Sequence, residues 1–187
     1  MIWIILGVVV IALIAVVSVY NSLVRKRNGV DNAAASIDVM LKRRFDLVPN
    51  LVATVDRYAS HEKGTLSELT RLRSQASDYN GLPASVRDAF NLAFDEAKVN
   101  LRAIAENYPD LKASSNFMHL QRSLNDIEEQ LAASIRTYNA CVTDYNNSLQ
   151  TFPSNIIASM SGFQPRQLLS VPAAESVNPD VKSLFAR

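Results

Sequence analysis

The sequence predicts an all-α protein in which an amino-terminal transmembrane helix continues into an elongated antiparallel helical bundle. Three observations indicate this fold. Residues 2–20 contain no charged side chain, which is the length and composition of a membrane span. Apolar residues then recur at steps of three and four along most of the chain, the spacing of one face of a helix. Gly and Pro, which interrupt helices, number only 5 and 7, and four of the Pro follow position 150.

The first element is a predicted membrane anchor over residues 1–20. A bilayer core about 30 Å thick needs about 20 apolar residues as a helix, because each residue adds about 1.5 Å. Trp3 and Tyr20 stand near the two ends, where aromatic rings favour the headgroup layer. The alternatives are a cleaved signal peptide, which would begin with basic residues and end at a small-residue cleavage site, and a buried core helix, which is rarely apolar on every face.

The distribution of basic residues predicts the orientation of this anchor. Basic residues occupy positions 25–27 and 42–44, and no Lys or Arg precedes the apolar run. The positive-inside rule therefore places the amino terminus outside and the domain in the cytoplasm. We expect a single-pass protein of the inner (plasma) membrane.

The anchor helix is expected to continue into the soluble domain, because residues 21–28 contain neither Gly nor Pro. Pro49 falls within the apolar stripe of this helix without shifting its phase, which favours a kink near residues 45–49. A tight reversal at residues 46–49 is the alternative. The bundle has three long helices if the first one kinks, and four if it reverses near Pro49 or Gly64. The stripe comprises Val30, Ala34, Ile37, Leu41, Phe45, Val48, Val52, Val55 and Ala59, and extends through Leu66, Leu69 and Leu72.

Two further helices are predicted after a stop at residues 78–83. The first covers about residues 83–107 and ends before Pro109, because the residue preceding a proline is disfavoured in helical geometry. The second covers about residues 111–150, and its apolar residues recur close to the 3.5-residue period of a coiled coil. This seam is too long for the 83–107 helix to cover, so it must pack on the first long helix or on another subunit. The seam comprises Phe117, Leu120, Leu124, Ile127, Leu131, Ile135, Tyr138, Val142, Tyr145, Leu149 and Phe152.

The predicted domain division is a transmembrane helix over residues 1–20, a helical bundle over 21–152, and a carboxy-terminal region over 153–187. This last region contains a short apolar segment, and from residue 165 three prolines and no periodicity predict a flexible tail. The candidate contacts with lipid or a partner in the apolar segment are Phe152, Ile156, Ile157, Met160 and Phe163.

Residues suited to catalysis or cofactor binding are scarce. The zinc motif His-Glu-x-x-His would start at His61, but position 65 is not His. The Glu-x-x-His motif of di-iron bundles fails at His119, because Asn116 stands three residues earlier. Cys141 has no evident His partner, and the chain has no Gly-rich phosphate loop. We therefore expect no enzymatic activity, no metal site and no cofactor, and a net charge of +1 gives no general attraction to nucleic acid.

The basic segment after the membrane-proximal region is the candidate partner or subunit contact. Arg is favoured in such contacts for its planar array of donors, and the alternative is a solvated helix face. A membrane contact is less favoured, because about 22 residues of helix would hold these charges about 30 Å from the membrane exit. The candidate residues are Lys42, Arg43, Arg44, Asp46 and Asn50.

Several sequence blocks form a recognisable pattern together. Residues 20–24 read Tyr-Asn-Ser-Leu-Val, residues 27–33 read Arg-Asn-Gly-Val-Asp-Asn-Ala, and residues 41–52 read Leu-Lys-Arg-Arg-Phe-Asp-Leu-Val-Pro-Asn-Leu-Val. Tyr-Asn pairs follow at positions 138 and 145, which we interpret as similar helix surfaces rather than duplicated units. The pattern, which covers roughly residues 1–165, resembles the LemA family of membrane-anchored bacterial proteins. The resemblance implies an amino-terminal transmembrane helix followed by a helical bundle, and implies no particular chemistry.

The expected function is that of a non-enzymatic, membrane-anchored helical scaffold that self-associates at the bacterial cell envelope. Anchoring confines copies to a plane and raises their effective concentration, so weak lateral contacts suffice. The alternatives are an adaptor or sensor that binds another envelope protein, and a membrane-shaping protein. The expected partners are therefore the lipid bilayer and further copies in a homo-oligomer, with another envelope protein as the alternative and no nucleic acid.

Overall fold

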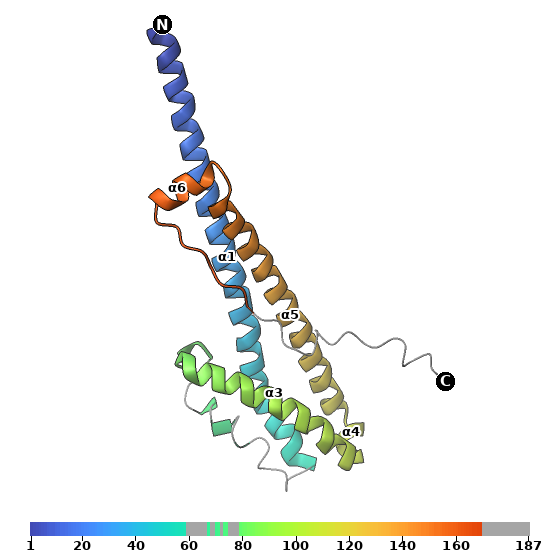
Figure 1. Cartoon of the computed structure of the whole chain (residues 1–187). Coiled ribbons are helices and arrows are strands. Elements are labelled where there is room, and N and C mark those ends of the chain that lie inside the picture. Colours follow the sequence, from blue (N-terminus) through green and yellow to red (C-terminus); the bar gives the residue numbers. More distant parts are fainter. Residues whose placement is uncertain (59–66, 68–69, 72, 75–78, 170–187) are drawn as a thin grey trace, which may run out of the picture. The chain divides into compact units, whose positions relative to one another are not determined.

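The computed structural model describes residues 1–58, 67, 70–71, 73–74 and 79–169 (Figure 1). Regular elements in these ranges are helices, which confirms the predicted all-α class. They are α1 (Ile2–Tyr58), the short 3₁₀ helix η1 (Tyr79–Gly81), α3 (Ala84–Asn107), α4 (Pro109–Ala113), α5 (Ser115–Gln150) and α6 (Ser154–Met160). The predictions that concern His61, Gly64 and the tail beyond residue 169 lie outside the described residues.

Helix α1 runs without interruption from Ile2 to Tyr58 and contains Pro49. The alternative of a reversal at residues 46–49 is therefore wrong. Phe45, Val48 and Leu51 flank the proline, and each is at most 1% exposed. Burial of such a side chain contributes about 1.5–3 kcal/mol. Three of them outweigh the roughly 3 kcal/mol that proline costs inside a helix.

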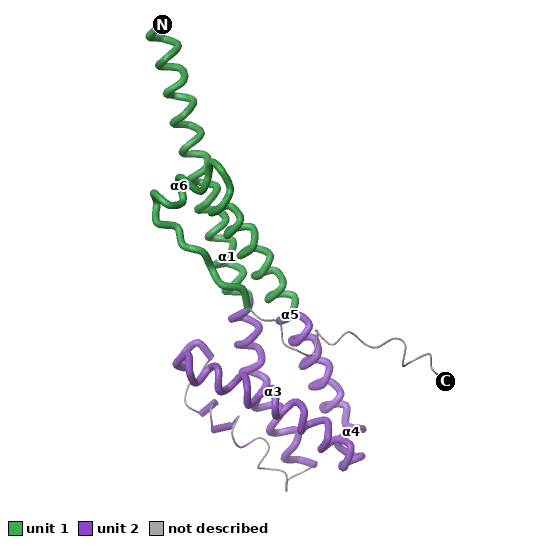
Figure 2. The backbone as a smooth tube through the Cα atoms, in the orientation of Figure 1, with its two compact units in different colours: residues 1–36, 132–187 green, residues 37–131 purple. Residues whose placement is uncertain are grey.

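The chain forms two compact units (Figure 2). Unit 1 comprises residues 1–36 and 132–187, and unit 2 comprises residues 37–131. Helices α1 and α5 contribute residues to both units, and each unit is described separately below.

Unit 2 is built around an aromatic cluster that joins α1, η1 and α3. The ring centroids of Phe45 and Phe90 are 5.2 Å apart, and the Tyr79 ring lies 6.2 Å from each of them. Phe94 lies one turn further along α3 and is also buried. The buried positions of α3 recur at steps of three and four, as the sequence predicts, and they are Phe90, Phe94, Ala97, Leu101 and Ile104, with Ala105 beside them.

The predicted helix over residues 111–150 is divided in the structure. Helix α4 begins at Pro109, where the missing N–H costs no hydrogen bond, and ends at Ala113. Ser114 then takes an extended conformation, with φ −64° and ψ 129°, before α5 begins. Helix α5 ends at Gln150, as predicted.

The seam of α5 is buried inside this chain. In unit 2, Phe117, Leu120 and Leu124 belong to the same buried cluster as Phe45 and Val48 of α1. In unit 1, Val142 and Tyr145 pack with Val30 of α1. The sequence predicted that the seam packs on the first long helix or on another subunit. In the structure it packs on the first long helix, α1. Phe152, predicted as the last seam residue, is exposed, because α5 has already ended.

Candidate functional site

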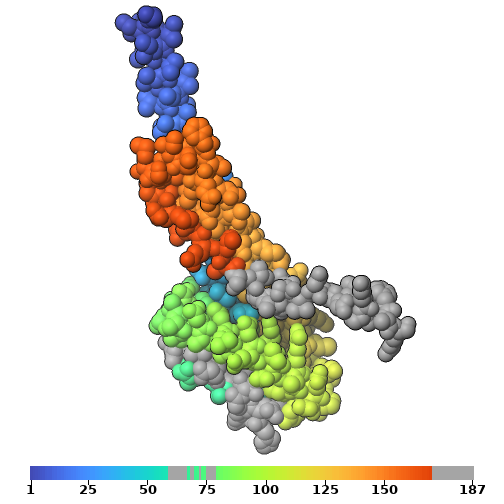
Figure 3. Space-filling model, in the orientation of Figure 1, coloured from blue at the N-terminus to red at the C-terminus, as the bar shows by residue number. Residues whose placement is uncertain are grey.

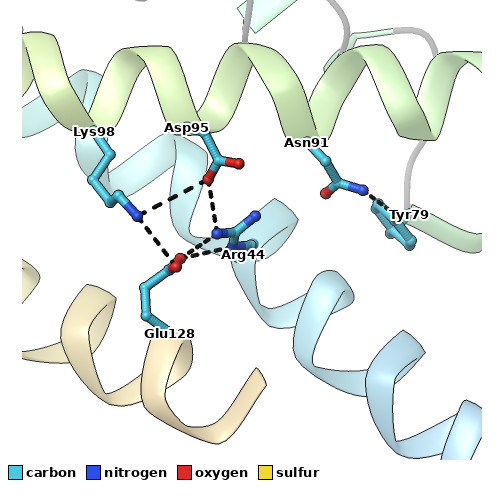
Figure 4. Close-up of polar contacts among 6 residues, drawn as sticks. All are labelled: Arg44, Tyr79, Asn91, Asp95, Lys98 and Glu128. Carbon is cyan, nitrogen blue, oxygen red and sulfur yellow. Dashed lines mark hydrogen bonds and ion pairs between the residues drawn. The ribbon is translucent and has the colours of Figure 1, made fainter. Parts of the chain in front are cut away.

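Arg44, one of the predicted contact residues, is buried at the centre of an ion-pair network in unit 2 (Figure 4). Its Nη2 donates to Asp95 Oδ1 of α3 at 2.9 Å, and its Nε donates to Glu128 Oε1 of α5 at 2.9 Å. Nη2 also contacts Glu128 Oε1. Lys98 completes the group, since its Nζ lies 3.2 Å from Glu128 Oε2 and 4.0 Å from Asp95 Oδ1. Two cations and two carboxylates thus join three helices without net charge.

This network explains how a guanidinium is tolerated at 4% exposure. Removing a charge from water costs several kcal/mol, which paired and hydrogen-bonded partners offset. The Arg44 guanidinium also lies 5.0 Å from the centre of the Phe94 ring, where the ring face favours a cation. Sequence reasoning missed Asp95, Lys98 and Glu128, because no local pattern links residues 51 and 84 positions apart.

The other predicted contact residues make contacts at the surface of the unit. Lys42 Nζ pairs with Asp46 Oδ2 at 3.1 Å on the same helix, and Arg43 Nη1 donates to Gln130 Oε1 at 3.0 Å. Asn50 is exposed. The Arg44 guanidinium is occupied within the chain, whereas an intermolecular role for the other four residues stays a prediction.

Asn50 lines a shallow groove between α1 and α5 in unit 2. The groove has a volume of about 420 Å³ and a mixed polar and apolar wall. Its lining residues are Leu47, Asn50, Ala53, Thr54, Asn116, His119, Leu120 and Ser123. In the part of the chain that the structure describes, no three His, Cys, Asp or Glu side chains are grouped as metal ligands.

In unit 1, two asparagines of α5 bind the backbone of the carboxy-terminal segment 164–169. Asn146 Nδ2 donates to the carbonyl of Arg166 at 2.8 Å, and its Oδ1 accepts the Arg166 N–H at 3.0 Å. Asn139 forms the same pair of bonds with Leu169, at 2.8 and 2.9 Å. The expectation of little fixed structure from residue 165 therefore does not hold for residues 165–169.

The tyrosine that precedes each asparagine holds the same segment. Tyr145 donates its O–H to the carbonyl of Gln164 at 3.0 Å, and Tyr138 donates to the carbonyl of Gln167 at 3.2 Å. Burial raises the pKa of the Tyr145 hydroxyl above its usual value. The four side chains bind main-chain atoms, so they restrain the segment without selecting its side chains.

The spacing of the two Tyr-Asn pairs has a geometric reason. Seven residues of helix rise about 10.5 Å, and three residues of extended chain rise about 10 Å. Two side chains seven residues apart on α5 are therefore spaced to bind two backbone groups three residues apart on the segment. The repeated Tyr-Asn pair was the available sequence signal, although it does not indicate what the pairs bind. Tyr20 makes a different contact, an edge-on ring contact with Phe163 at 5.9 Å.

The amino-terminal part of α1 in unit 1 is exposed along nearly its whole apolar run. Residues 1–18 are all exposed, although nearly all are apolar. Within the described residues, α1 is the one helix that is long and apolar enough to cross a membrane. The candidate lipid contacts Phe152, Ile156 and Met160 are also exposed, whereas Ile157 and Phe163 are half-buried.

Comparisons with known proteins identify one family and several relatives. The model of the LemA family matches residues 33–183. Protein LemA of Metamycoplasma hominis is 28% identical over 164 residues, which cover 88% of this chain and 74% of that protein. Magnetosome protein MamQ of Magnetospirillum gryphiswaldense is 23% identical, over 85% of this chain and 69% of that protein. Magnetosome protein MamQ 2 of Paramagnetospirillum magneticum is 23% identical, over 78% of this chain and 62% of that protein.

Proposed function

The chain belongs to the LemA family, and from this premise we propose that it is a non-enzymatic, membrane-anchored helical scaffold that self-associates at the bacterial cell envelope. The observation that carries the proposal is the exposed apolar run at the start of α1. In water, the exposure of such a run is energetically unfavourable. In a bilayer the same side chains would contact lipid, and the run is long enough to span the hydrocarbon core. The same helix continues beyond this run, and its Val30 packs with Val142 and Tyr145 of unit 1, so the anchor is continuous with a packed helix.

The orientation we propose places the amino terminus outside and the two units in the cytoplasm. Arg25 and Arg27 are exposed where the apolar run ends, and basic residues favour the cytoplasmic side of a membrane span. A thiol reagent that cannot cross membranes tests this on Asn125→Cys in a Cys141→Ala background. Labelling is expected in inverted membrane vesicles and not in right-side-out vesicles, and the reverse pattern would place the domain outside.

Self-association is supported by the outer face of α3. Leu92 and Val99 lie two turns apart on that face and are 64% and 65% exposed. Ala89 and Ala103 continue the exposed apolar stripe on either side, with Glu96 between the two larger residues. The seam of α5 no longer requires a second copy, so α3 is the surface we assign to lateral contacts.

Counting photobleaching steps of the full-length protein in lipid vesicles tests this assignment. We expect oligomers of the wild-type chain and monomers of Leu92→Glu and Val99→Glu, because a charge in an apolar contact is costly. Asn125→Glu adds the same charge at an exposed position of α5 and should leave the oligomers intact. A wild-type chain that stays monomeric at high density in the bilayer would refute the scaffold proposal.

A second candidate function, an adaptor for another envelope protein, is favoured by the groove that contains Asn50 and His119. A photocrosslinker at Asn50 in living cells tests it, with the exposed Asn125 of α5 as the control position. One defined envelope protein captured from Asn50 and absent from the control supports the adaptor. Capture of only lipid and copies of the same chain refutes it.

A further inference from the structure

One end of unit 1 carries no charged side chain. Residues 145–165, which include the last turn of α5, α6 and the turn after it, contain no Asp, Glu, Lys or Arg. On α1, charges are absent from residue 2 to residue 24. Charged residues make up about a quarter of a typical soluble domain, so a run of 21 residues without one is unusual.

Where the charge-free stretches end, ion pairs link the three segments of this unit. Lys26 of α1 pairs with Asp144 of α5, with 2.6 Å between Nζ and Oδ1. Arg166 of the carboxy-terminal segment pairs with Asp31 of α1, with 3.4 Å between Nη2 and Oδ1. These ion pairs form a boundary, with the charge-free residues of α1, α5 and α6 on one side of it.

The charge-free end also presents large apolar side chains to the outside. Phe152 is 79% exposed, Met160 is 83% exposed and Ile156 is 49% exposed. Ile156 and Met160 lie one turn apart on α6, so they share a face. The opposite face of α6 contains Ala158, which is buried within the unit. Helix α6 therefore presents apolar side chains both toward the unit and away from it, with the polar Asn155 and Ser159 also exposed.

Contacts within unit 1 place this end beside the membrane helix. The Phe163 ring lies edge-on to Tyr20, which ends the predicted membrane span, at 5.9 Å. The Arg27 guanidinium lies 5.4 Å from the centre of the same ring. In Figure 1, α6 lies against α1, and Figure 3 shows the corresponding orange surface next to the exposed blue part of α1.

We propose that residues 152–163 are a second membrane contact, which lies in the headgroup–acyl boundary of the bilayer that α1 spans. Helices of this kind bury an apolar face about 5–10 Å into that boundary. Phe152, Ile156 and Met160 enter the lipid. Arg25 and Arg27 face the phosphate groups, as basic residues do at membrane surfaces. The inference rests on the proposed anchor, because the anchor supplies the nearby bilayer.

The occupant is lipid rather than a second copy of the chain for two reasons. A protein interface has a polar rim with hydrogen bonds and charges, and this surface has no charged residue on which to build one. A copy that covered α6 would also have to displace the lipid around the adjoining end of α1. The contact fixes the rotation and depth of unit 1 at the membrane, which a single helix cannot do alone.

The test uses the full-length protein in phosphatidylcholine–phosphatidylglycerol vesicles with an environment-sensitive fluorophore on single cysteines. The background is Cys141→Ala, and the test positions are Ile156→Cys and Met160→Cys. Ala133→Cys is the control, since it is exposed on α5 of the same unit and lies about 25 Å of helix away from the end of α5. Val9→Cys reports insertion of α1. Spin-labelled lipids with shallow or deep labels serve as quenchers.

We expect blue-shifted emission at positions 156 and 160, with stronger quenching by the shallow label than by the deep one, and neither effect at position 133. If position 9 is quenched but positions 156 and 160 resemble position 133, the second contact is refuted while the anchor stands. Blue-shifted emission at 156 and 160 without lipid quenching assigns the surface to a protein and also refutes the inference. If position 9 is not quenched, the anchor itself fails, and the inference fails with it.

Discussion

The side chain of Asn146 and the backbone of Arg166 form a closed pair of hydrogen bonds, 2.8 and 3.0 Å long. Such a pair satisfies both main-chain groups of an extended residue, which would otherwise depend on water. The same arrangement recurs at Asn139 and Leu169. The two pairs hold the carboxy-terminal segment, which follows α6, along α5 within unit 1.

Asn146→Ala should release this segment without unfolding the bundle. Amide hydrogen exchange at Arg166 is expected to accelerate by about tenfold or more, because each lost hydrogen bond contributes about 0.5–1.5 kcal/mol. Asn147→Ala is the matched control, since Asn147 is the next residue of α5 and its side chain is exposed. Unchanged exchange at Arg166 in Asn146→Ala would show that the segment is held by other contacts.

Glu128→Ala should destabilise the protein more than Arg44→Met does. The first change leaves a buried guanidinium with Asp95 as its remaining ion-pair partner, and loss of a partner in a buried pair costs about 3–5 kcal/mol. The lower end applies here, because Glu128 and Asp95 are partly exposed. The second change removes the buried charge itself and leaves carboxylates that reach water. Urea unfolding in detergent measures both, with the exposed Glu129→Ala as control, and equal losses would contradict the burial argument.

Stability should fall as the pH rises above about 10. Burial raises the pKa of the Tyr79 and Tyr145 hydroxyls, with the Asn91 hydrogen bond opposing the shift at Tyr79. In the unfolded chain these groups release protons near their usual value of 10.0, while in the folded chain they retain them. The folded state then binds more protons than the unfolded state, so the free energy of unfolding decreases with pH. Below pH 10 their contribution is fully present.

Tyr145→Phe is the variant that checks this assignment. It should lower stability at neutral pH, because the hydrogen bond to Gln164 is lost, and it should make the alkaline decline shallower. Thermal unfolding between pH 8 and 11 measures both effects. A decline as steep as that of the wild-type chain would exclude Tyr145 as a contributor.

Two glycines should respond to alanine in opposite directions. Gly29 lies inside α1, and an added Cβ would meet no atom within 4 Å, so Gly29→Ala should stabilise the protein by about 1 kcal/mol. Gly162 has the same open surroundings, but its φ is +70°. Gly162→Ala should therefore cost about 1–2 kcal/mol. Calorimetric unfolding of both variants compares them directly, and a shift of the same sign in both would contradict the backbone argument.

Local pattern was sufficient to predict the long helices α1, α3 and α5, although α6 was expected only as a short apolar segment. The limits of α3 and the end of α5 follow from Pro109, from the Asn-Gly pair before Pro83 and from the apolar spacing, which act within a few residues. Continuity through Pro49 was also indicated, since the stripe keeps its phase across the proline. The break at Ser114 was not predicted, because nothing in its own sequence stops a helix there.

Composition and periodicity thus determined the class of the fold, the membrane-length run in α1 and the family resemblance, because each depends on residues that are near one another in the chain. The tertiary structure decided which helix covers the seam of α5, why Arg44 is buried and what the Tyr-Asn pairs bind. These depend on groups that lie 19 to 115 residues apart in the sequence. In the carboxy-terminal segment the groups that are bound belong to the backbone, which is the same for almost every residue type and therefore leaves no pattern in the sequence.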